Sequence, residues 1–307
     1  MFATIIGLYP HQDATSDAER LTDVLADQLE GGMGLLTDGR IHDCADGPGP
    51  VLAAWRAADA MGRHLAAEAG LQPPLIKACL LGPWSSAPGE RAGIEAATDA
   101  LLPAIEALFE AGAPVVQVTE PGIGDIDGAD LAAIELVSEV LERVASPFAV
   151  PDRHLSLALA GGGPTRVPAE RLLVGFSSYL LDLIASPDDW DVCARVPGAA
   201  GLIVGVVDAR AARAGAAEVG VWGARYAASM AGRGPARTGI CPGAGIERLD
   251  RAAARALLAF TADVARKGDL PDTELMREVD PATIDARSAA LGRPEPRPRG
   301  ARRSPGR

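Results

Sequence analysis

Short apolar runs alternate with longer segments of helical periodicity along most of the chain. Such runs are typical of strands in a parallel sheet, where both faces of the sheet are covered. They fall at residues 3–7, 34–37, 75–81, 114–119, 154–160, 201–207 and 237–241. Segments with helical spacing lie between them, at residues 17–30, 51–69, 90–111, 130–144, 218–231 and 250–267. Residues 172–174 and 180–184 fit either a strand or a short helix.

This alternation gives close to eight strand–helix units, the number and length expected of a closed (β/α)8 TIM barrel. An open doubly wound sheet is the competing topology, but residues 7–10 lack the glycine-rich fingerprint expected after its first strand. We therefore predict an α/β protein with a single barrel over residues 1–270. Residues 271–307 form a C-terminal extension, which we expect to be disordered from about residue 293 because it is rich in proline, glycine and arginine.

Composition narrows the function classes. The 307 residues are 48% hydrophobic and 23% charged, and the formal net charge is −12. We expect a globular protein that binds a small molecule, because such an acidic chain is a poor nucleic-acid ligand. No run of about 20 apolar residues predicts a membrane span, and the start of the chain has no signal-peptide pattern. We expect a cytoplasmic location, and a homo-oligomer stays open.

Polar or glycine–proline signatures follow several of the predicted strands. Glu120 ends an apolar strand, and Pro121, which lacks an N–H, stops the ladder after it. In a barrel the carboxyl ends of the strands meet at the catalytic face. The signatures are Tyr9-Pro10-His11, Asp38-Gly39-Arg40, Gly82-Pro83-Trp84, Thr119-Glu120-Pro121, Asp208-Ala209-Arg210 and Pro242-Gly243-Ala244-Gly245.

This ordered set resembles the catalytic C-terminal barrel of cobalamin-independent methionine synthase, in the wider family that includes uroporphyrinogen decarboxylase. The resemblance spans about residues 4–267. It is carried by Gly7 to Pro10 (Gly-Ser-Phe-Pro in the family), Asp38-Gly39 (Asp-Gly-Glu), Lys77 to Pro83 (Lys-x-x-x-x-Gly-Pro), residues 116–121 (Ile-Gln-Ile-Asp-Glu-Pro), Gly205 to Asp208 (Gly-x-x-Asp) and residues 241–246 (Asn-Pro-Asp-Cys-Gly-Leu).

The departures from the family bear on its zinc. The family holds zinc with a His-x-Cys pair, a glutamate and a final cysteine, and the metal activates a thiol substrate. Here residues 157–160 are apolar, residues 176–179 hold no carboxylate, and Ala244 stands at the final cysteine. The four histidines and four cysteines show no other metal-binding spacing. We therefore expect no zinc, and we expect the cysteines to be small buried residues.

The expected substrate pocket is altered as well. The family's acidic pair at the fourth strand holds the substrate amino group, and Thr119 replaces its first acid. Arg40 stands where the family has glutamate, so a thiol amino acid such as homocysteine is a poor fit. The folate side remains, because Trp84 lies where the family stacks a pterin ring. A rim position under a loop is the alternative for Trp84.

We expect a zinc-independent methyltransferase that moves a methyl group from 5-methyltetrahydrofolate to a non-thiol acceptor. The alternatives are a metal-free lyase of the uroporphyrinogen decarboxylase type and a non-catalytic ligand-binding homologue. The resemblance and the strand-end positions imply catalytic roles for Glu120, Asp208 and Asp38. Lys77 fits either a salt bridge at the barrel wall or a substrate contact, and Asp208 fits a structural cap as well. The expected binding residues are Thr119, Lys77, Arg40, His11 and Tyr179 for the substrate, and Trp84 for the folate.

Overall fold

The computed structural model describes residues 1–10, 16–160, 166–209 and 217–279. Seven parallel strands form one sheet in the order β1-β9-β8-β7-β6-β5-β4, and β2 pairs in parallel with β3. The strands are β1 (Phe2–Ala3), β2 (Leu35–Leu36), β3 (Leu75–Ile76), β4 (Ala78–Leu81), β5 (Val116–Thr119), β6 (Leu155–Leu159), β7 (Ser178–Asp182), β8 (Gly201–Val207) and β9 (Thr238–Pro242).

Hydrogen bonds through β2 join the two edges of the larger sheet. The Gly34 amide donates to Ala3 O at 2.9 Å, which links the start of β2 to β1. On the other side, the Lys77 amide donates to Leu36 O at 2.9 Å, and β3 and β4 flank Lys77 in the chain. The strands thus occupy eight positions around a closed (β/α)8 barrel, as the alternation of apolar and helical segments predicts.

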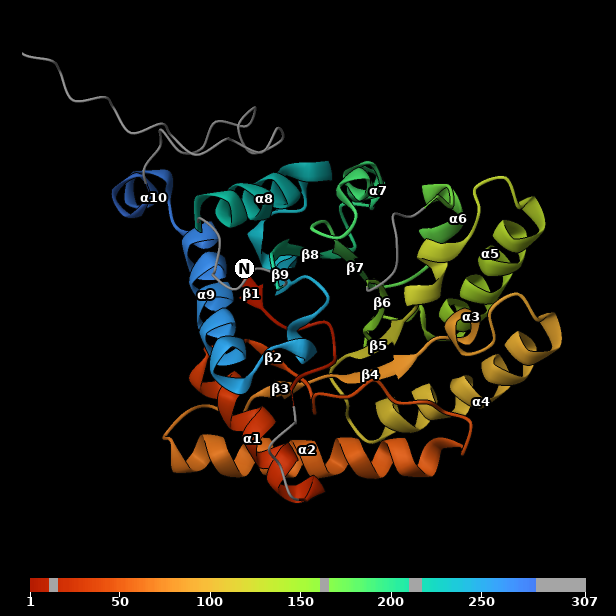
Figure 1. Cartoon of the computed structure of the whole chain (residues 1–307), viewed down its shortest axis with the longest axis horizontal. Helices are drawn as coiled ribbons and strands as arrows, with labels where there is room; N and C mark the ends of the chain where they lie inside the picture. The colour runs from red at the N-terminus through yellow and green to blue at the C-terminus, as the bar shows by residue number, and fades with distance from the viewer. Residues whose placement is uncertain (11–15, 161–165, 210–216, 280–307) are drawn as a thin grey trace, which may run out of the picture.

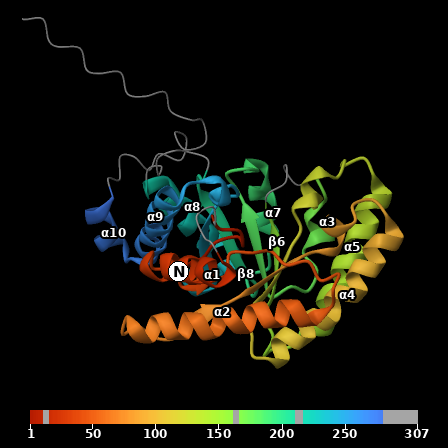
Figure 2. The ribbon, with the colours of Figure 1, turned by 60° about the horizontal axis from the view of Figure 1, so that its bottom comes forward.

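The helices surround the strands, as Figures 1 and 2 show. Neighbours in the ring pack on one another, including α1 on α2, α2 on α4, α4 on α5, and α9 on both α8 and α1. None of the described helices is both long and apolar enough to cross a membrane. The α-helices are α1 (Asp17–Glu30), α2 (Pro48–Glu68), α3 (Pro83–Ser86), α4 (Arg91–Glu110), α5 (Leu131–Ala145), α6 (Ala169–Leu172), α7 (Trp190–Arg195), α8 (Ala217–Ser229), α9 (Arg251–Asp269) and α10 (Asp272–Glu278).

Alternation along the strands separates an outer core from the barrel interior. Outward positions such as Val118, Leu157 and Val204 belong to the large apolar core beneath the helices. The interior holds a smaller apolar cluster of Ile6, Ala158, Ala160, Leu180, Ile203 and Cys241. Several interior positions are instead polar and almost fully buried, namely Lys77, Gln117, Thr119, Ser156 and Ser178. The interior is thus a mixed environment, with polar groups from four neighbouring strands.

Most predicted element boundaries agree with the structure to within a few residues. Ser16 caps α1, where its hydroxyl accepts from the Glu19 amide at 3.2 Å. In the ambiguous segment 180–184, residues 180–182 belong to strand β7, and in the segment 172–174 Leu172 ends the short helix α6 and the next two residues follow it. The strand predicted at 114–119 begins at Val116, because residue 114 is a proline without an N–H to donate. The expectation of disorder from residue 293 lies outside the described residues.

Candidate functional site

Glu120 follows β5 and anchors the turn after β4. It is 1% exposed, and its carboxylate accepts three hydrogen bonds. The Trp84 amide donates to Oε1 at 3.0 Å, and the Ser85 amide and hydroxyl donate to Oε2 at 2.8 and 2.6 Å. Amides in the first turn of a helix have no carbonyl within the helix to donate to. Here the Glu120 carboxylate accepts from the two amides of α3, as the side chain of an N-cap residue does. The position of Glu120 at a strand end thus has a structural reason.

Gly82 makes room for this carboxylate. A Cβ on Gly82 would lie 2.2 Å from the Glu120 carboxyl carbon, which is far inside van der Waals contact. Burial raises the pKa of Glu120 to about 7, against the opposing effect of the hydrogen bonds from Ser85 and Trp84. A pKa of about 7 places this carboxyl near its protonation midpoint at neutral pH, and all the hydrogen bonds described for its side chain go to the α3 turn.

Trp84 lies on the wall of a second feature, an open pocket of about 950 Å³ beside the carboxyl ends of β4 and β5. Its indole Nε1 donates to Gly122 O at 3.1 Å, and the residue is 5% exposed. Asp125, Asp127 and Asp130 line the same pocket. The pocket thus combines an indole edge with carboxylates, the two groups expected for a pterin, although little of the ring face is free for stacking.

Asp182 is a further carboxylate at the carboxyl ends of the strands, and the sequence analysis did not predict it. It ends β7 and is 2% exposed. Its Oδ2 accepts from the Ala244 amide at 2.7 Å, and its Oδ1 accepts from the Ile184 and Ala185 amides at 3.2 and 3.0 Å. Asp182 therefore fixes the loop after β9, just as Glu120 fixes the turn after β4. The ambiguity between strand and helix at 180–184 concealed this strand-end position.

Asp38 and His42 form the carboxylate–imidazole pair of this face. His42 Nε2 lies 2.6 Å from Asp38 Oδ2, and both side chains are mostly buried, at 17% and 9% exposed. His42 is fixed on the neighbouring strand, because its amide donates to Cys79 O and its carbonyl accepts from Leu81 N, each at 2.8 Å. An Asp38 carboxylate accepting from Nε2–H leaves Nδ1 with its lone pair, so the imidazole can accept a proton there.

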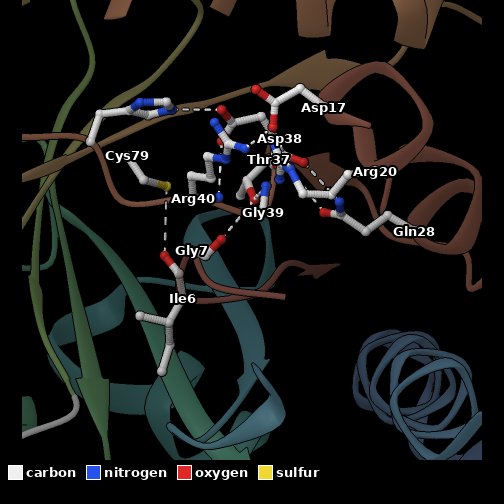
Figure 3. Close-up of polar contacts among 11 residues, drawn as sticks. Ile6, Gly7, Asp17, Arg20, Gln28, Thr37, Asp38, Gly39, Arg40 and Cys79 are labelled. Carbon is white, nitrogen blue, oxygen red and sulfur yellow. Dashed lines mark hydrogen bonds and ion pairs between the residues drawn. The ribbon is translucent and has the colours of Figure 1, made fainter. Parts of the chain in front are cut away.

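The turn that carries Asp38 is held from several sides (Figure 3). The Gln28 side chain contacts Thr37 through both its amide oxygen and its nitrogen, at 3.0 and 2.8 Å, and Arg20 donates to Asp38 O at 3.0 Å. The next residue, Gly39, has φ 76°, a left-handed conformation that favours glycine. Because these contacts fix its backbone, Asp38 is preorganised to orient His42.

Lys77 and Thr119 belong to a polar row inside the barrel. Lys77 Nζ donates to Ile5 O at 2.7 Å and to Gln117 Oε1 at 2.6 Å. Gln117 Nε2 donates to Ile6 O at 2.6 Å and to Thr119 Oγ1 at 3.0 Å. Among the described residues Lys77 forms no ion pair, and the two acceptors of its ammonium are uncharged. Burial lowers the pKa of Lys77, because the interior disfavours its ammonium form.

The remaining predicted residues are spread more widely. Arg40 is half-exposed and pairs with Asp17 of α1. Asp208 is half-buried at the end of β8. Tyr179 lies near the amino end of β7, away from the strand-end group, and burial raises its pKa to about 12. His11 lies outside the described residues. The structure thus brings Asp38, Thr119 and Glu120 to the carboxyl-end face, but places Tyr179 elsewhere.

The donor groups present do not suit the family's zinc. All four cysteines are free and buried, as expected, and burial raises the pKa of Cys79 to about 11 and that of Cys241 further still. In the described part of the chain, no three histidine, cysteine, aspartate or glutamate side chains converge on a common point.

Comparison with known proteins extends these observations. No protein-family model matches the sequence, and no curated protein does so either. The structure resembles a B12-independent methionine synthase from Shewanella sp. W3-18-1, solved with selenomethionine, with a TM-score of 0.64 and 13% identity over 90% of this chain and 97% of that one. A Listeria monocytogenes structure assigned to the same enzyme class has the same TM-score and identity, over 87% of this chain and 97% of that one.

A methyltransferase from Methanosarcina mazei is also similar, with a TM-score of 0.52 and 13% identity over 85% of this chain and 94% of that one. At such low identity these similarities show a shared TIM-barrel fold. They cover the barrel from end to end, so the (β/α)8 architecture predicted from the sequence is confirmed.

Proposed function

We propose that this protein is a divergent methionine synthase-like methyltransferase that uses a folate-type methyl donor and a non-thiol acceptor, without zinc. The Asp38–His42 pair carries the proposal, because it is a preorganised proton acceptor at the carboxyl-end face of the barrel. The resemblance of the strand-end motifs supports the family, and so does the likeness in fold to methionine synthases and a methyltransferase.

The pocket beside Trp84 is the proposed donor site. Carboxylates such as Asp125 can accept hydrogen bonds from the amino edge of a pterin, and the largely buried Trp84 forms part of the pocket wall. Leu81 lines this pocket, and its amide is hydrogen-bonded to His42 O, so the donor and proton-acceptor regions are neighbours on β4. When bound, 5-methyltetrahydrofolate would supply the methyl group.

His42 accepts the proton that the acceptor loses. An ammonium acceptor would become a nucleophilic amine as one N–H proton moves to His42 Nδ1, and Asp38 would stabilise the resulting imidazolium through Nε2–H. The amine lone pair would form the new bond to the methyl carbon as the bond between that carbon and N5 of the donor breaks, and N5 would take up a proton as tetrahydrofolate leaves. A nucleophile of this kind needs no metal, unlike a thiol that zinc must ionise. Thr119, which replaces an acid of the family, fits an acceptor without the amino group of homocysteine.

The test is consumption of the methyl donor in the presence of a panel of amines and amino acids, measured as tetrahydrofolate formed. Asp38→Asn should reduce turnover by about 100-fold, in the range expected for a general acid–base residue. Asp43→Asn is the matched control, because Asp43 is exposed and its carboxylate only caps the Ala45 amide. Equal turnover by Asp38→Asn and the parent protein would exclude the proposed base.

A further inference from the structure

A cavity of about 870 Å³ opens at the amino-terminal ends of the strands, opposite the face that carries Asp38 and Glu120. Its walls include residues at or just before the starts of the strands, among them Gly34, Leu75 and Gly201. The volume lies within the range of small-molecule sites. Because barrel enzymes use the opposite face for catalysis, the proposed methyltransferase function gives this cavity no role.

The inner end of the cavity carries a connected polar group. His154 Nε2 lies 2.8 Å from Ser178 Oγ, which in turn donates to Ser156 Oγ at 2.9 Å. Lys77 and Gln117 line the cavity beside them. All but His154 are at most 3% exposed, so these groups are set in a nearly water-free environment.

In its ammonium form Lys77 makes this group electropositive, and an anionic ligand beside it would favour that form against the neutral amine that burial favours. An ammonium has three N–H donors, and the two hydrogen bonds of Lys77 go to the uncharged acceptors Ile5 O and Gln117 Oε1. No described carboxylate lies within ion-pair distance of Nζ. A buried cation without a counter-charge is costly, and an anionic ligand group beside it would offset that cost.

The rest of the wall has an apolar part and a polar part, and the polar part includes Asp152, Arg153, Ser177 and Arg237. Phe2, Leu35, Leu75, Phe176 and Ile203 line the cavity between the polar end and the opening. Leu75 is 56% exposed at the opening. The cavity thus offers hydrocarbon surface together with basic side chains, which suits an amphipathic molecule with one anionic end.

We propose that this cavity binds a small organic acid, with its carboxylate beside Lys77 and Ser178 and its apolar body against the outer wall. The site is separate from the carboxyl-end face and does not depend on the methyltransferase proposal. Ser178 and Ser156 can turn their hydroxyl protons toward a carboxylate, because a hydroxyl both donates and accepts.

The test compares hexanoate with hexan-1-ol, probes that differ in the charged group, by calorimetric titration of the full-length protein. Hexanoate should bind about tenfold more tightly than the alcohol, and Lys77→Met should remove that difference. Because Lys77 is buried and its variant carries a folding risk, Leu75→Glu provides a second test at the opening. It should weaken hexanoate at least about fivefold more than the alcohol, because a negative charge at the opening repels an anion inside the cavity but not a neutral alcohol.

Leu131→Glu is the matched control, since Leu131 is another well-exposed leucine and lies outside the cavity, and it should leave both probes unaffected. Binding of 5-methyltetrahydrofolate should also be unchanged in Leu75→Glu, which separates this site from the proposed donor site. The proposal is overturned if neither probe binds at millimolar concentration, if both bind equally, or if Leu75→Glu and Leu131→Glu have the same effect on hexanoate.

Discussion

Glu120 should make the protein less stable as the pH rises toward neutrality. Burial raises the pKa of Glu120 in the folded protein to about 7, from an ordinary value of 4.5. Between these two pH values the folded state keeps a proton that the unfolded state has lost. The stabilisation is therefore complete below about pH 4.5 and is lost as the pH rises through about 7. A difference of about 2.5 pH units corresponds to about 3 kcal/mol.

Glu120→Gln removes this titration and keeps the shape of the side chain. The free energy of unfolding of the parent protein minus that of Glu120→Gln should fall by about 3 kcal/mol between pH 4.5 and pH 7. Urea unfolding of both proteins at a series of pH values measures this difference in free energy. The other carboxylates titrate alike in the two proteins, so their contributions cancel in the difference. The exposed Glu274→Gln controls for the loss of a carboxylate.

Two outcomes would refute this reasoning. A difference in free energy that stays constant with pH would mean that folding does not change the pKa of Glu120. A difference that grows with pH would mean that the three hydrogen bonds from Trp84 and Ser85 outweigh burial and keep the carboxylate ionised. Either result would mean that the folded protein does not hold an extra proton on Glu120 between pH 4.5 and pH 7.

Two further stability predictions are checked by urea unfolding at pH 7. Gly82→Ala should lower the free energy of unfolding by about 3 kcal/mol or more, because the added Cβ has no room beside Glu120. Gly49→Ala in α2 is the control and should raise it by up to about 1 kcal/mol, since nothing lies within 4 Å of the added Cβ. Equal effects of the two substitutions would contradict the crowding at Gly82. Arg251→Met should cost about 1–2 kcal/mol, because Asp27, 2% exposed, loses its bidentate partner but keeps its ion pair with Arg255. The exposed Arg248→Met should change stability by less than about 0.5 kcal/mol, and an equally small effect of Arg251→Met would count against the buried pair.

The barrel could be predicted because its signals are local. Apolar runs such as Gly201–Val207 mark strands without reference to the rest of the chain, and Ser16 marks a helix start three residues ahead of Glu19. The closure of the barrel could only be inferred from the number of units. It depends on hydrogen bonds such as that from Gly34 to Ala3, between residues far apart in sequence.

The site was less predictable because side-chain direction depends on tertiary contacts. A carboxylate at a strand end has the same sequence pattern whether its side chain faces a substrate or a neighbouring turn. Glu120 faces a neighbouring turn. The partnership of Asp38 with His42 was not identified, since the chain first has to bring His42 onto β4. The cavity near Lys77 is formed by six or more segments, and no local pattern encodes such a space.

The central claim is that the barrel binds a folate-type methyl donor and needs no zinc for it. The most direct measurement is a fluorescence titration of the full-length protein with 5-methyltetrahydrofolate in the presence of EDTA, with Trp84→Phe to assign the signal. Saturable binding that EDTA leaves unchanged, and that weakens in Asp125→Asn, is the predicted result. No binding at millimolar donor, or binding that EDTA abolishes, would contradict the account.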